Sequence, residues 1–322
     1  LKAKMMKNIQ PIFVFSVMRS GSTLLQRILS RHSLISSYSE PWFLLPLIYS
    51  QRHTGVLTEY GHSVASRALS DIRQEISEIK LDDYLRKFAM NLYKDLSEDS
   101  SIYFVDKTPR YFYIVDDILR IFPDAKFIFL WRNPIDVMAS LVNTAFSGKW
   151  KIHSFEKDIV MGYSQLCRAY NDNKNRCIAM RYEDLLSDPH LTINEVCNYL
   201  EVKSDDSMLD IQNYSLKGSL GDPITSNQQS KIRSEPSENR EVLYKNQLRI
   251  RDVQRLVSLL PASYLTLMGY SKESLIDSVM LEKKSTGVAG ILRDFYHSRR
   301  SILEQKLKRK MLKSNPYNFK VK

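Results

Sequence analysis

Short apolar runs that end at polar residues recur along the chain, and their spacing predicts strands that alternate with helices. Four runs have the β-branched and aromatic content of buried strands, and they cover residues 11–17, 102–105, 126–131 and 176–180. Apolar residues at helical spacing follow the first run from Leu24 onward, and they also mark residues 111–121 and 134–143. This alternation predicts a mostly parallel sheet that is covered by helices on both faces.

Two further segments extend this outline. Residues 64–79 and 81–96 have amphipathic helical patterns, so a helical insertion is expected before the second strand. Residues 213–241 are polar and turn-rich, which predicts a long loop of the kind that is usually functional or disordered. Because ligands of open parallel sheets bind outside the carboxyl ends of the strands, the residues that follow each strand are the first candidates for a site.

Composition excludes several classes of protein. The chain has 322 residues, of which 43% are hydrophobic and 26% charged, with 10 Gly and 11 Pro, and this excludes collagen, low-complexity disorder and a disulfide scaffold. We find no apolar run long enough to span a membrane and no secretion signal. The three cysteines lack CxxC spacing, which favours reduced thiols and a cytoplasmic location. The first residue is Leu, which leaves open a processed chain or a fragment whose signal or anchor has been removed.

Positive charge is concentrated at the C-terminal end. The formal net charge is +11, and residues 282–322 hold 12 basic and 3 acidic residues of the total. Apolar residues recur there at roughly helical spacing from Leu292 to Met311, with arginines and lysines between them, which predicts a basic amphipathic helix. Two interpretations stay open: a solvated helix that packs one face on the body, or a helix that docks on a membrane, a nucleic acid or an acidic protein.

The first candidate for chemistry is the loop Arg-Ser-Gly-Ser-Thr at residues 19–23, between the first strand and the helix after it. Gly21 lets the backbone approach a ligand, and the amides and dipole at a helix start favour anions, so the loop is suited to hold a phosphate. It lacks the GxxxxGK[ST] pattern of a Walker A loop. A serine-rich turn that merely caps a helix is the structural alternative.

A second candidate follows the third strand. Arg132 is placed at the end of this strand, and Ser140 is about two turns into the helix that Pro134 begins. Together these side chains are predicted to hold another anionic group.

These segments resemble the nucleotide site of sulfotransferases that use 3′-phosphoadenosine 5′-phosphosulfate (PAPS). Residues 19–25 are similar to the family's 5′-phosphosulfate loop, and Arg132 with Ser140 to its 3′-phosphate site. Residues 181–185 resemble the segment whose tyrosine lies near the adenine, and residues 217–222 the lysine-glycine loop that closes over the nucleotide. The resemblance implies that the following residues bind the nucleotide: Arg19, Ser20, Gly21, Ser22, Thr23, Arg132, Ser140, Tyr182, Lys217 and Gly218.

Differences from the usual motifs of this family indicate which of its branches the chain resembles. Members that sulfate small phenols and steroids carry Lys in the first loop and a catalytic His after the second strand, whereas this chain has Arg19 and no His in residues 106–110. Arg19 together with Glu40 resembles the carbohydrate and tyrosylprotein branches and many bacterial members. Leu216 and Pro223 depart from the usual lysine-glycine loop.

Sulfuryl transfer needs a base for the acceptor's proton and cations for the charge on the leaving phosphate. Glu40 is the candidate base, and Arg19 and Lys107 are the candidate cations. The structural alternatives are a helix cap or surface ion pair for Glu40 and a strand-end salt bridge for Lys107.

We therefore expect an α/β, three-layer P-loop-like fold with a central mostly parallel sheet, helical insertions and a basic C-terminal helical extension. The expected division is a sulfotransferase domain at residues 1–281 and a basic helical tail at 282–322. The expected reaction moves the sulfuryl group of PAPS, by in-line displacement and without a metal, to a hydroxyl, or as second choice an amine, of a small-molecule or carbohydrate acceptor. The product nucleotide would be PAP, and the acceptor pocket is expected to involve residues 41–100.

Two other functions are weighed against this reaction. A P-loop-type nucleotide kinase or other phosphotransferase is disfavoured because no lysine follows Gly21. A non-enzymatic protein that binds nucleic acid or membrane surfaces would explain the basic tail but not the ordered motifs. No nucleic-acid partner is expected, while contact of the tail with anionic surfaces remains open.

Overall fold

The predicted strands lie in one five-stranded parallel sheet. The computed structural model describes residues 8–211, 214–218, 237–280 and 288–313. The strand order is β2-β3-β1-β4-β5, and every neighbouring pair is parallel, so the predicted α/β fold with a mostly parallel sheet is confirmed. The strands are β1 (Gln10–Phe15), β2 (Ile35–Ser37), β3 (Tyr103–Asp106), β4 (Lys126–Trp131) and β5 (Cys177–Arg181).

The helices follow the strands in the alternation that the pattern predicted. In chain order the α-helices of the described residues are α1 (Ser22–Leu29), α2 (Leu44–Tyr49), α3 (His62–Ile76), α4 (Glu78–Leu96), α5 (Val115–Ile121), α6 (Pro134–Thr144), α7 (Glu156–Asp172), α8 (Tyr182–Ser187), α9 (Pro189–Tyr199), α11 (Gln247–Ser258), α12 (Ala262–Leu267), α13 (Lys272–Met280) and α14 (Val288–Lys313). Shorter 3₁₀ helices are η1 (Tyr111–Tyr113), η2 (Ile152–Phe155), η3 (Lys174–Arg176), η4 (Asp206–Leu209) and η5 (Ser237–Leu243).

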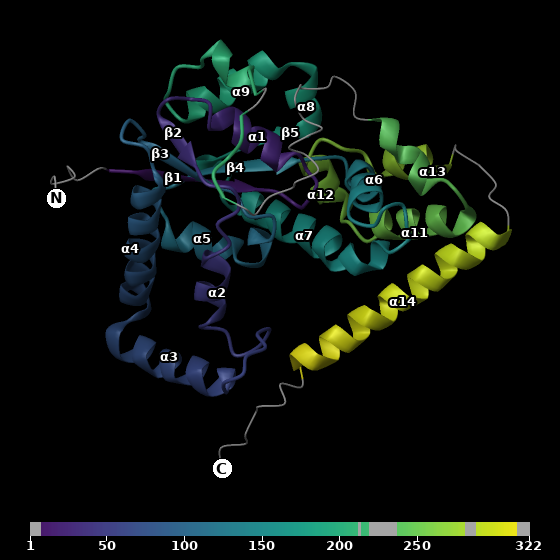
Figure 1. The fold of residues 1–322 in the computed structure, drawn as a ribbon, viewed down its shortest axis with the longest axis horizontal. Helices are drawn as coiled ribbons and strands as arrows, with labels where there is room; N and C mark the ends of the chain where they lie inside the picture. Colours follow the sequence, from purple (N-terminus) through teal and green to yellow (C-terminus); the bar gives the residue numbers. More distant parts are fainter. Residues whose placement is uncertain (1–7, 212–213, 219–236, 281–287, 314–322) are drawn as a thin grey trace.

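Alternate residues of the central strands build two cores. In β1, Phe13 and Phe15 pack on the face covered by α4, α5 and α7, whereas Ile12 and Val14 face α1, α8 and α9. The same alternation divides the side chains of β4 between the two cores. Figure 1 shows the resulting three layers, with α1, α8 and α9 on one side of the sheet and α5 and α7 on the other. Burial on both faces explains why the strands have continuous apolar sequences.

The predicted helical insertion is present as α3 and α4. Ser77 separates the two helices with a left-handed φ of 75°, and its hydroxyl accepts a hydrogen bond from the backbone N–H of Lys80 at the start of α4. With α2, the two helices form an arm that extends away from the sheet (Figure 1). The strand β2 was absent from the sequence prediction because three residues, two of them serines, carry too short a pattern to recognise.

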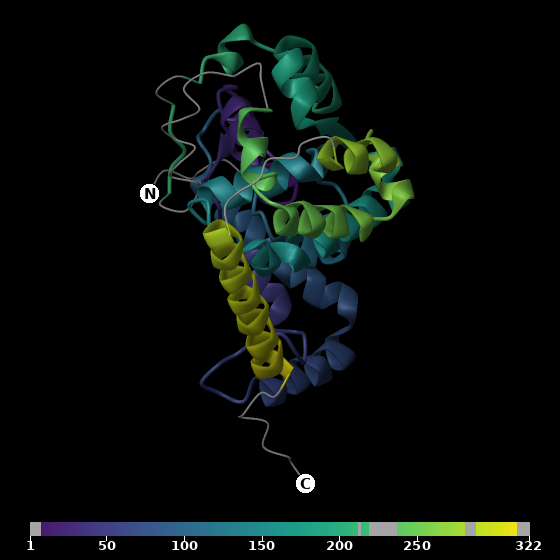
Figure 2. The ribbon, with the colours of Figure 1, turned by 90° about the vertical axis from the view of Figure 1, so that its right-hand side faces the viewer.

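The C-terminal segment contains the expected helix. α14 packs on α11 and η2 and lies along the outside of the body, as Figures 1 and 2 show from two directions. The division of the chain at residue 281 stays a prediction. No helix among the described residues has the length and apolar content needed to cross a membrane. Most of the predicted loop at residues 213–241, namely residue 213 and residues 219–236, falls outside the described residues.

Candidate active site at the carboxyl edge of the sheet

The loop after β1 has a backbone shape that only a glycine allows at its centre. Arg19 and Gly21 both have left-handed φ angles, of 65° and 88°. A Cβ atom on Gly21 would lie 2.1 Å from Cδ2 of Tyr182, so any larger residue there would collide with that ring. The loop therefore combines a strained turn with a close approach of an aromatic ring, and α1 begins at Ser22, directly after Gly21.

Three segments far apart in the sequence meet at this loop. Arg19 Nε donates a hydrogen bond to Ser140 Oγ at 3.0 Å, and Arg132 Nη1 donates to the carbonyl oxygen of Arg19 at 2.8 Å. The guanidinium of Arg132 lies over the ring of Tyr182, 4.4 Å from its centroid. The structure thus brings together the sequence-predicted residues of the phosphosulfate loop, the 3′-phosphate site and the tyrosine segment.

The charges of this cluster suit an anionic ligand. Burial, and then the neighbouring positive charge of Arg132, lower the pKa of Arg19 to about 10. Two adjacent guanidinium groups repel each other, and an anion between them would relieve that repulsion. Among the described residues, Ser20 Oγ and Arg132 Nε are buried without a hydrogen-bond partner. Since buried polar atoms are normally paired, these two atoms fit a site that binds phosphate or sulfate oxygens.

Glu40 and Lys107 form a buried ion pair beside the same loop. Lys107 Nζ donates to Glu40 Oε1 at 2.6 Å, and it lies 3.3 Å from Thr23 Oγ1. The exposed fractions of the two side chains are 12% for Glu40 and 1% for Lys107. Burial lowers the pKa of Lys107, while the charge and hydrogen bond of Glu40 oppose that shift. The three residues connect the β2, β3 and β1 ends of the sheet, so the candidate base and a candidate cation lie next to the loop at residues 19–23.

Trp42 is a site residue that sequence reasoning missed. Its indole Nε1 donates to Glu40 Oε2 at 3.0 Å, so both carboxylate oxygens of Glu40 accept a hydrogen bond. Trp42 has a left-handed φ of 58°, and its backbone N–H donates to Thr108 Oγ1. The spacing of two residues around Pro41 was visible in the sequence, but the direction of the indole was not.

Arg240 is a second residue that the sequence did not indicate. It forms a two-bond ion pair with Asp136 in the first turn of α6, at 2.5 and 2.8 Å. This contact fixes η5 on the helix that carries Ser140. Nothing in the local sequence links residues that are 104 positions apart.

Lys217 and Gly218 are placed only in part as predicted. The carbonyl oxygen of Lys217 accepts a hydrogen bond from the backbone N–H of Ser39 at 2.8 Å, which holds this segment beside Glu40. The ammonium group, however, is largely exposed and lies 3.4 Å from Glu98 Oε1. This ammonium group therefore does not join the predicted 3′-phosphate residues Arg132 and Ser140 in the described part of the chain. Residues 219–222 of the predicted loop lie outside the described residues, and nucleotide binding by Lys217 and Gly218 stays a prediction.

Other candidate groups have their own partners. His53 Nδ1 is 3.0 Å from Ser66 Oγ, and His153 lies between Glu156 and Asp252. Within the described ranges, no group of three or more His, Cys, Asp or Glu side chains is arranged to hold a metal ion.

Asp106, the residue before Lys107, gives a testable dependence of stability on pH. Burial raises the pKa of its carboxyl from 3.8 to about 7, although hydrogen bonds from Tyr93 and Tyr111 act in the opposite direction. The folded chain thus holds this proton more tightly than the unfolded chain. The stabilisation from Asp106 is complete below about pH 4 and is lost as the pH rises through about 7.

We expect the Asp106→Asn variant, which cannot ionise, to gain stability relative to the natural chain between about pH 5 and pH 8. Urea unfolding at several pH values would measure the difference. The exposed Asp116→Asn variant is the control and should follow the natural chain. Parallel pH profiles for Asp106→Asn and the natural chain would contradict the assigned protonation.

Comparison with known proteins gives a consistent result. A model of a protein family described as "Sulfotransferase family" matches residues 11–206. Nodulation protein NoeE of Sinorhizobium fredii (strain NBRC 101917 / NGR234) is 30% identical over 148 residues, which are 44% of this chain and 34% of that protein. A putative protein-tyrosine sulfotransferase of Caenorhabditis briggsae is 27% identical over 204 residues, which are 62% of this chain and 68% of that protein.

The matches differ in how much of each protein they cover. The chain spans about a third of NoeE (34%) and about a quarter (26%) of an uncharacterized protein of Aquifex aeolicus (strain VF5), to which it is 28% identical over 222 residues. Among solved structures, the sulfotransferase domain from the curacin biosynthetic pathway has a TM-score of 0.53 at 21% identity. That match covers 79% of this chain and 99% of the domain, and it supports the fold.

Proposed function

The chain belongs to the sulfotransferase family, and on this basis we propose that it moves the sulfuryl group of PAPS to a hydroxyl group of a small-molecule or carbohydrate acceptor. An amine is the second choice of acceptor group. The contact among Glu40, Lys107 and Thr23 is the observation that carries the proposal, because a carboxylate and an ammonium group lie against the loop at residues 19–23.

The nucleotide is assigned to the cluster at the carboxyl edge. In this assignment the loop from Arg19 to Thr23 holds the 5′-phosphosulfate, Arg132 and Ser140 hold the 3′-phosphate, and Tyr182 lies beside the adenine. Support comes from the contacts of Arg132 with the loop and with Tyr182, and from the buried unpaired atoms of Ser20 and Arg132. PAPS would supply an activated sulfuryl group whose leaving group is a phosphate.

Each residue then has a chemical role. A carboxylate oxygen of Glu40 accepts the proton of the acceptor hydroxyl, which makes the acceptor oxygen a better nucleophile. Lys107 Nζ and the Arg19 guanidinium provide positive charge at the loop, where negative charge develops on the leaving phosphate. Trp42 is a positioning residue, since its indole holds one oxygen of Glu40 in place. Burial of the Glu40–Lys107 pair strengthens these interactions, because little water competes with them.

The acceptor is to be found by experiment. A screen with labelled PAPS against extracts and defined hydroxyl compounds, followed by mass detection of an added sulfuryl group, would identify it. Tyrosine-containing peptides belong in the screen, because two relatives are named protein-tyrosine sulfotransferases. Labelling of a carbohydrate or small molecule, with no transfer to the peptides, would support the proposed acceptor class. Exclusive transfer to peptides would contradict it.

Nucleotide binding gives the direct test of the site. PAP should raise the melting temperature, since a ligand that binds only the folded chain stabilises it. Adenosine 5′-phosphate lacks the 3′-phosphate and should raise the melting temperature much less. The Arg132→Ala variant should bind PAP more weakly by about 1.5–3 kcal/mol, the range for a hydrogen bond to a charged group.

Arg168→Ala is the matched control for this measurement. Arg168 is a partly exposed arginine in an ion pair with Asp116, away from the loop, and its loss should leave PAP binding unchanged. Equal stabilisation of the natural chain by both nucleotides would remove the assigned role of Arg132 and Ser140. ATP hydrolysis or phosphoryl transfer, with no response to PAP, would instead favour a kinase.

A further inference from the structure

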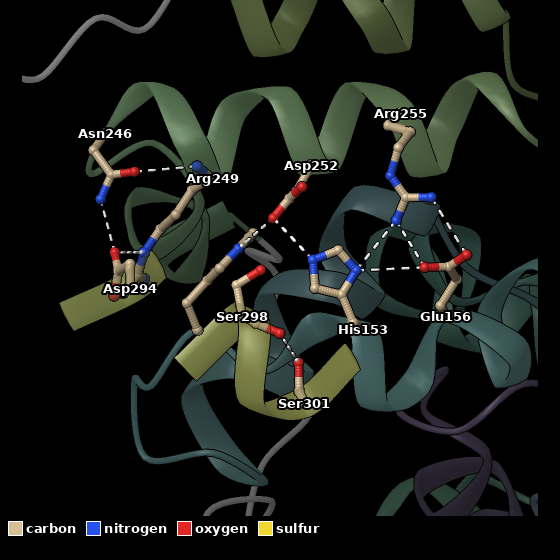
Figure 3. Close-up of polar contacts among 10 residues, drawn as sticks. His153, Glu156, Asn246, Arg249, Asp252, Arg255, Asp294, Ser298 and Ser301 are labelled. Atoms are coloured by element: carbon tan, nitrogen blue, oxygen red, sulfur yellow. Dashed lines mark hydrogen bonds and ion pairs between the residues drawn. The ribbon is translucent and has the colours of Figure 1, made fainter. Parts of the chain in front are cut away.

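The helix α14 turns a polar side toward the body of the protein. Asp294, Ser298 and Ser301 are its most buried residues, with exposed fractions of 2%, 5% and 0%. Arg249 holds Asp294 with two hydrogen bonds, at 2.6 and 2.8 Å, and Asn246 adds a third at 2.7 Å. Figure 3 shows these contacts between α11 and α14. Polar contacts, and not an apolar stripe, therefore fasten this helix.

The large apolar side chains of α14 are exposed instead. Positions 292, 296, 303 and 307 fall within about 60° of one another on a helix of 3.6 residues per turn, on the side away from Asp294. Exposed fractions of the apolar side chains are 63% for Leu292, 47% for Phe295, 59% for Tyr296, 58% for Leu303, 53% for Leu307 and 57% for Met311. A surface helix normally has the reverse arrangement, with its apolar side on the core. An apolar stripe of this kind indicates a binding surface.

Cations lie among these apolar residues. Arg299, Lys306 and Lys310 are exposed, and their positions along the helix bring them to the same side as Leu303. Residues 282–322 carry 12 basic and 3 acidic residues, whereas the rest of the chain has 35 and 33. The outward side of α14 is thus both apolar and strongly positive, and long basic side chains can extend past buried apolar neighbours to reach an anionic layer.

A cavity beside the same helix is lined by two of these cations, Arg299 and Lys306. It has a volume of about 450 Å³ and lies among η2, α11 and α14. Its lining includes four cations, Arg255, Arg299, Lys306 and Arg309, and two carboxylates, Glu156 and Asp252. Glu156 is paired with Arg255, and Asp252 accepts a hydrogen bond from Trp150 and lies 3.2 Å from His153. The three other cations therefore leave the cavity with a positive charge that suits an anionic lipid headgroup.

We propose that α14 docks this chain on the surface of an anionic lipid bilayer. Leu292, Tyr296, Leu303 and Leu307 enter the headgroup region, and the cations between them bind lipid phosphates. A nucleic acid would satisfy the cations but leave the leucines in water. A flat bilayer accepts both kinds of side chain along the whole helix, which is about 39 Å long at 1.5 Å per residue. The proposal is independent of the sulfuryl-transfer chemistry.

Vesicle binding by the full chain tests this proposal. We expect sedimentation with vesicles of phosphatidylcholine and phosphatidylglycerol, little with phosphatidylcholine alone, and weaker binding at high salt. The double variant Leu303→Gln with Leu307→Gln should bind at least about tenfold more weakly, since it removes inserted apolar area. Lys306→Gln and Lys310→Gln should each weaken binding about fivefold.

A matched variant controls for the loss of exposed apolar surface in general. Ile72→Gln with Ile79→Gln changes two exposed apolar residues, at 49% and 82%, in the α3–α4 arm and should keep full vesicle binding. Failure of the natural chain to bind anionic vesicles would overturn the proposal. Vesicle binding that is unchanged in the Leu303→Gln, Leu307→Gln variant would also overturn the proposal. In that case, tight binding of a DNA duplex by the same variant would identify a purely electrostatic partner. The response of the melting temperature to PAP should be the same in all these variants, which separates this test from that of the nucleotide site.

Discussion

Replacement of Glu40 by Gln is expected to lower turnover by roughly 10²-fold or more, while PAP affinity stays within a few-fold. Gln has almost the size of Glu but cannot take a proton at neutral pH. Glu40 Oε1 and Oε2 are placed by Lys107 and Trp42, so the carboxylate that is lost is an oriented one. Turnover of the acceptor found with labelled PAPS, at saturating nucleotide, measures the effect.

Trp42→Phe serves as the control that separates positioning from base chemistry. It removes the indole N–H but keeps an aromatic ring and the carboxylate. The carboxylate keeps its contact with Lys107 but loses the contact that orients Oε2, so kcat should fall while PAP affinity stays unchanged. A smaller loss of turnover than in Glu40→Gln is expected. If Glu40→Gln turned over at nearly the natural rate, Glu40 would not be the base, and His53 or His153 would be tested next.

Removal of the carboxylate of Asp294 should cause the largest loss of stability. Arg249 and Asp294 are 1% and 3% exposed, and Asp294→Ala would leave the Arg249 guanidinium buried without its counter-charge. Breaking a buried ion pair in this way costs about 3–5 kcal/mol. Chemical unfolding followed by circular dichroism measures the difference from the natural chain.

Glu304→Ala is the matched control for this prediction. Its partner Arg300 is four residues earlier on the same helix, and both side chains are about half exposed. Such a pair contributes about 0.3–0.5 kcal/mol, so this variant should be almost as stable as the natural chain. Equal stability of Asp294→Ala and Glu304→Ala would mean that the Arg249–Asp294 pair does not hold α14 on the body.

The position of the site at one edge of the sheet could be predicted from local sequence. Apolar runs ended at Arg19, Lys107 and Arg132, or within a few residues of them, and each run was long enough to predict a strand. Once the strands are parallel, their carboxyl ends meet at one edge, so residues more than 100 positions apart become neighbours without further information. The contacts of Arg19 with Ser140 and Arg132 follow from that geometry.

The direction of individual side chains was decided by tertiary structure. Glu40 was predicted to return to the loop, but the strand β2 that brings it there was too short to recognise. Trp42 points at Glu40 because of a left-handed backbone and a contact with Thr108, and neither has a local sequence pattern. The backbone carbonyl of Lys217 accepts a hydrogen bond from Ser39, while its ammonium group lies near Glu98.

The helix α14 shows the same division between sequence and tertiary structure. The chain sequence determined that residues near 288–313 form a basic helix, because helix formation depends on spacing and propensity within a few turns. Which side of that helix faces the body depended on one distant partner, Arg249, whose buried charge requires Asp294. The periodic spacing of apolar residues predicts that the apolar side of a helix packs against the body of the protein. An unpaired buried charge costs about 3–5 kcal/mol, so the contact with Arg249 fixes the side that carries Asp294 against the body.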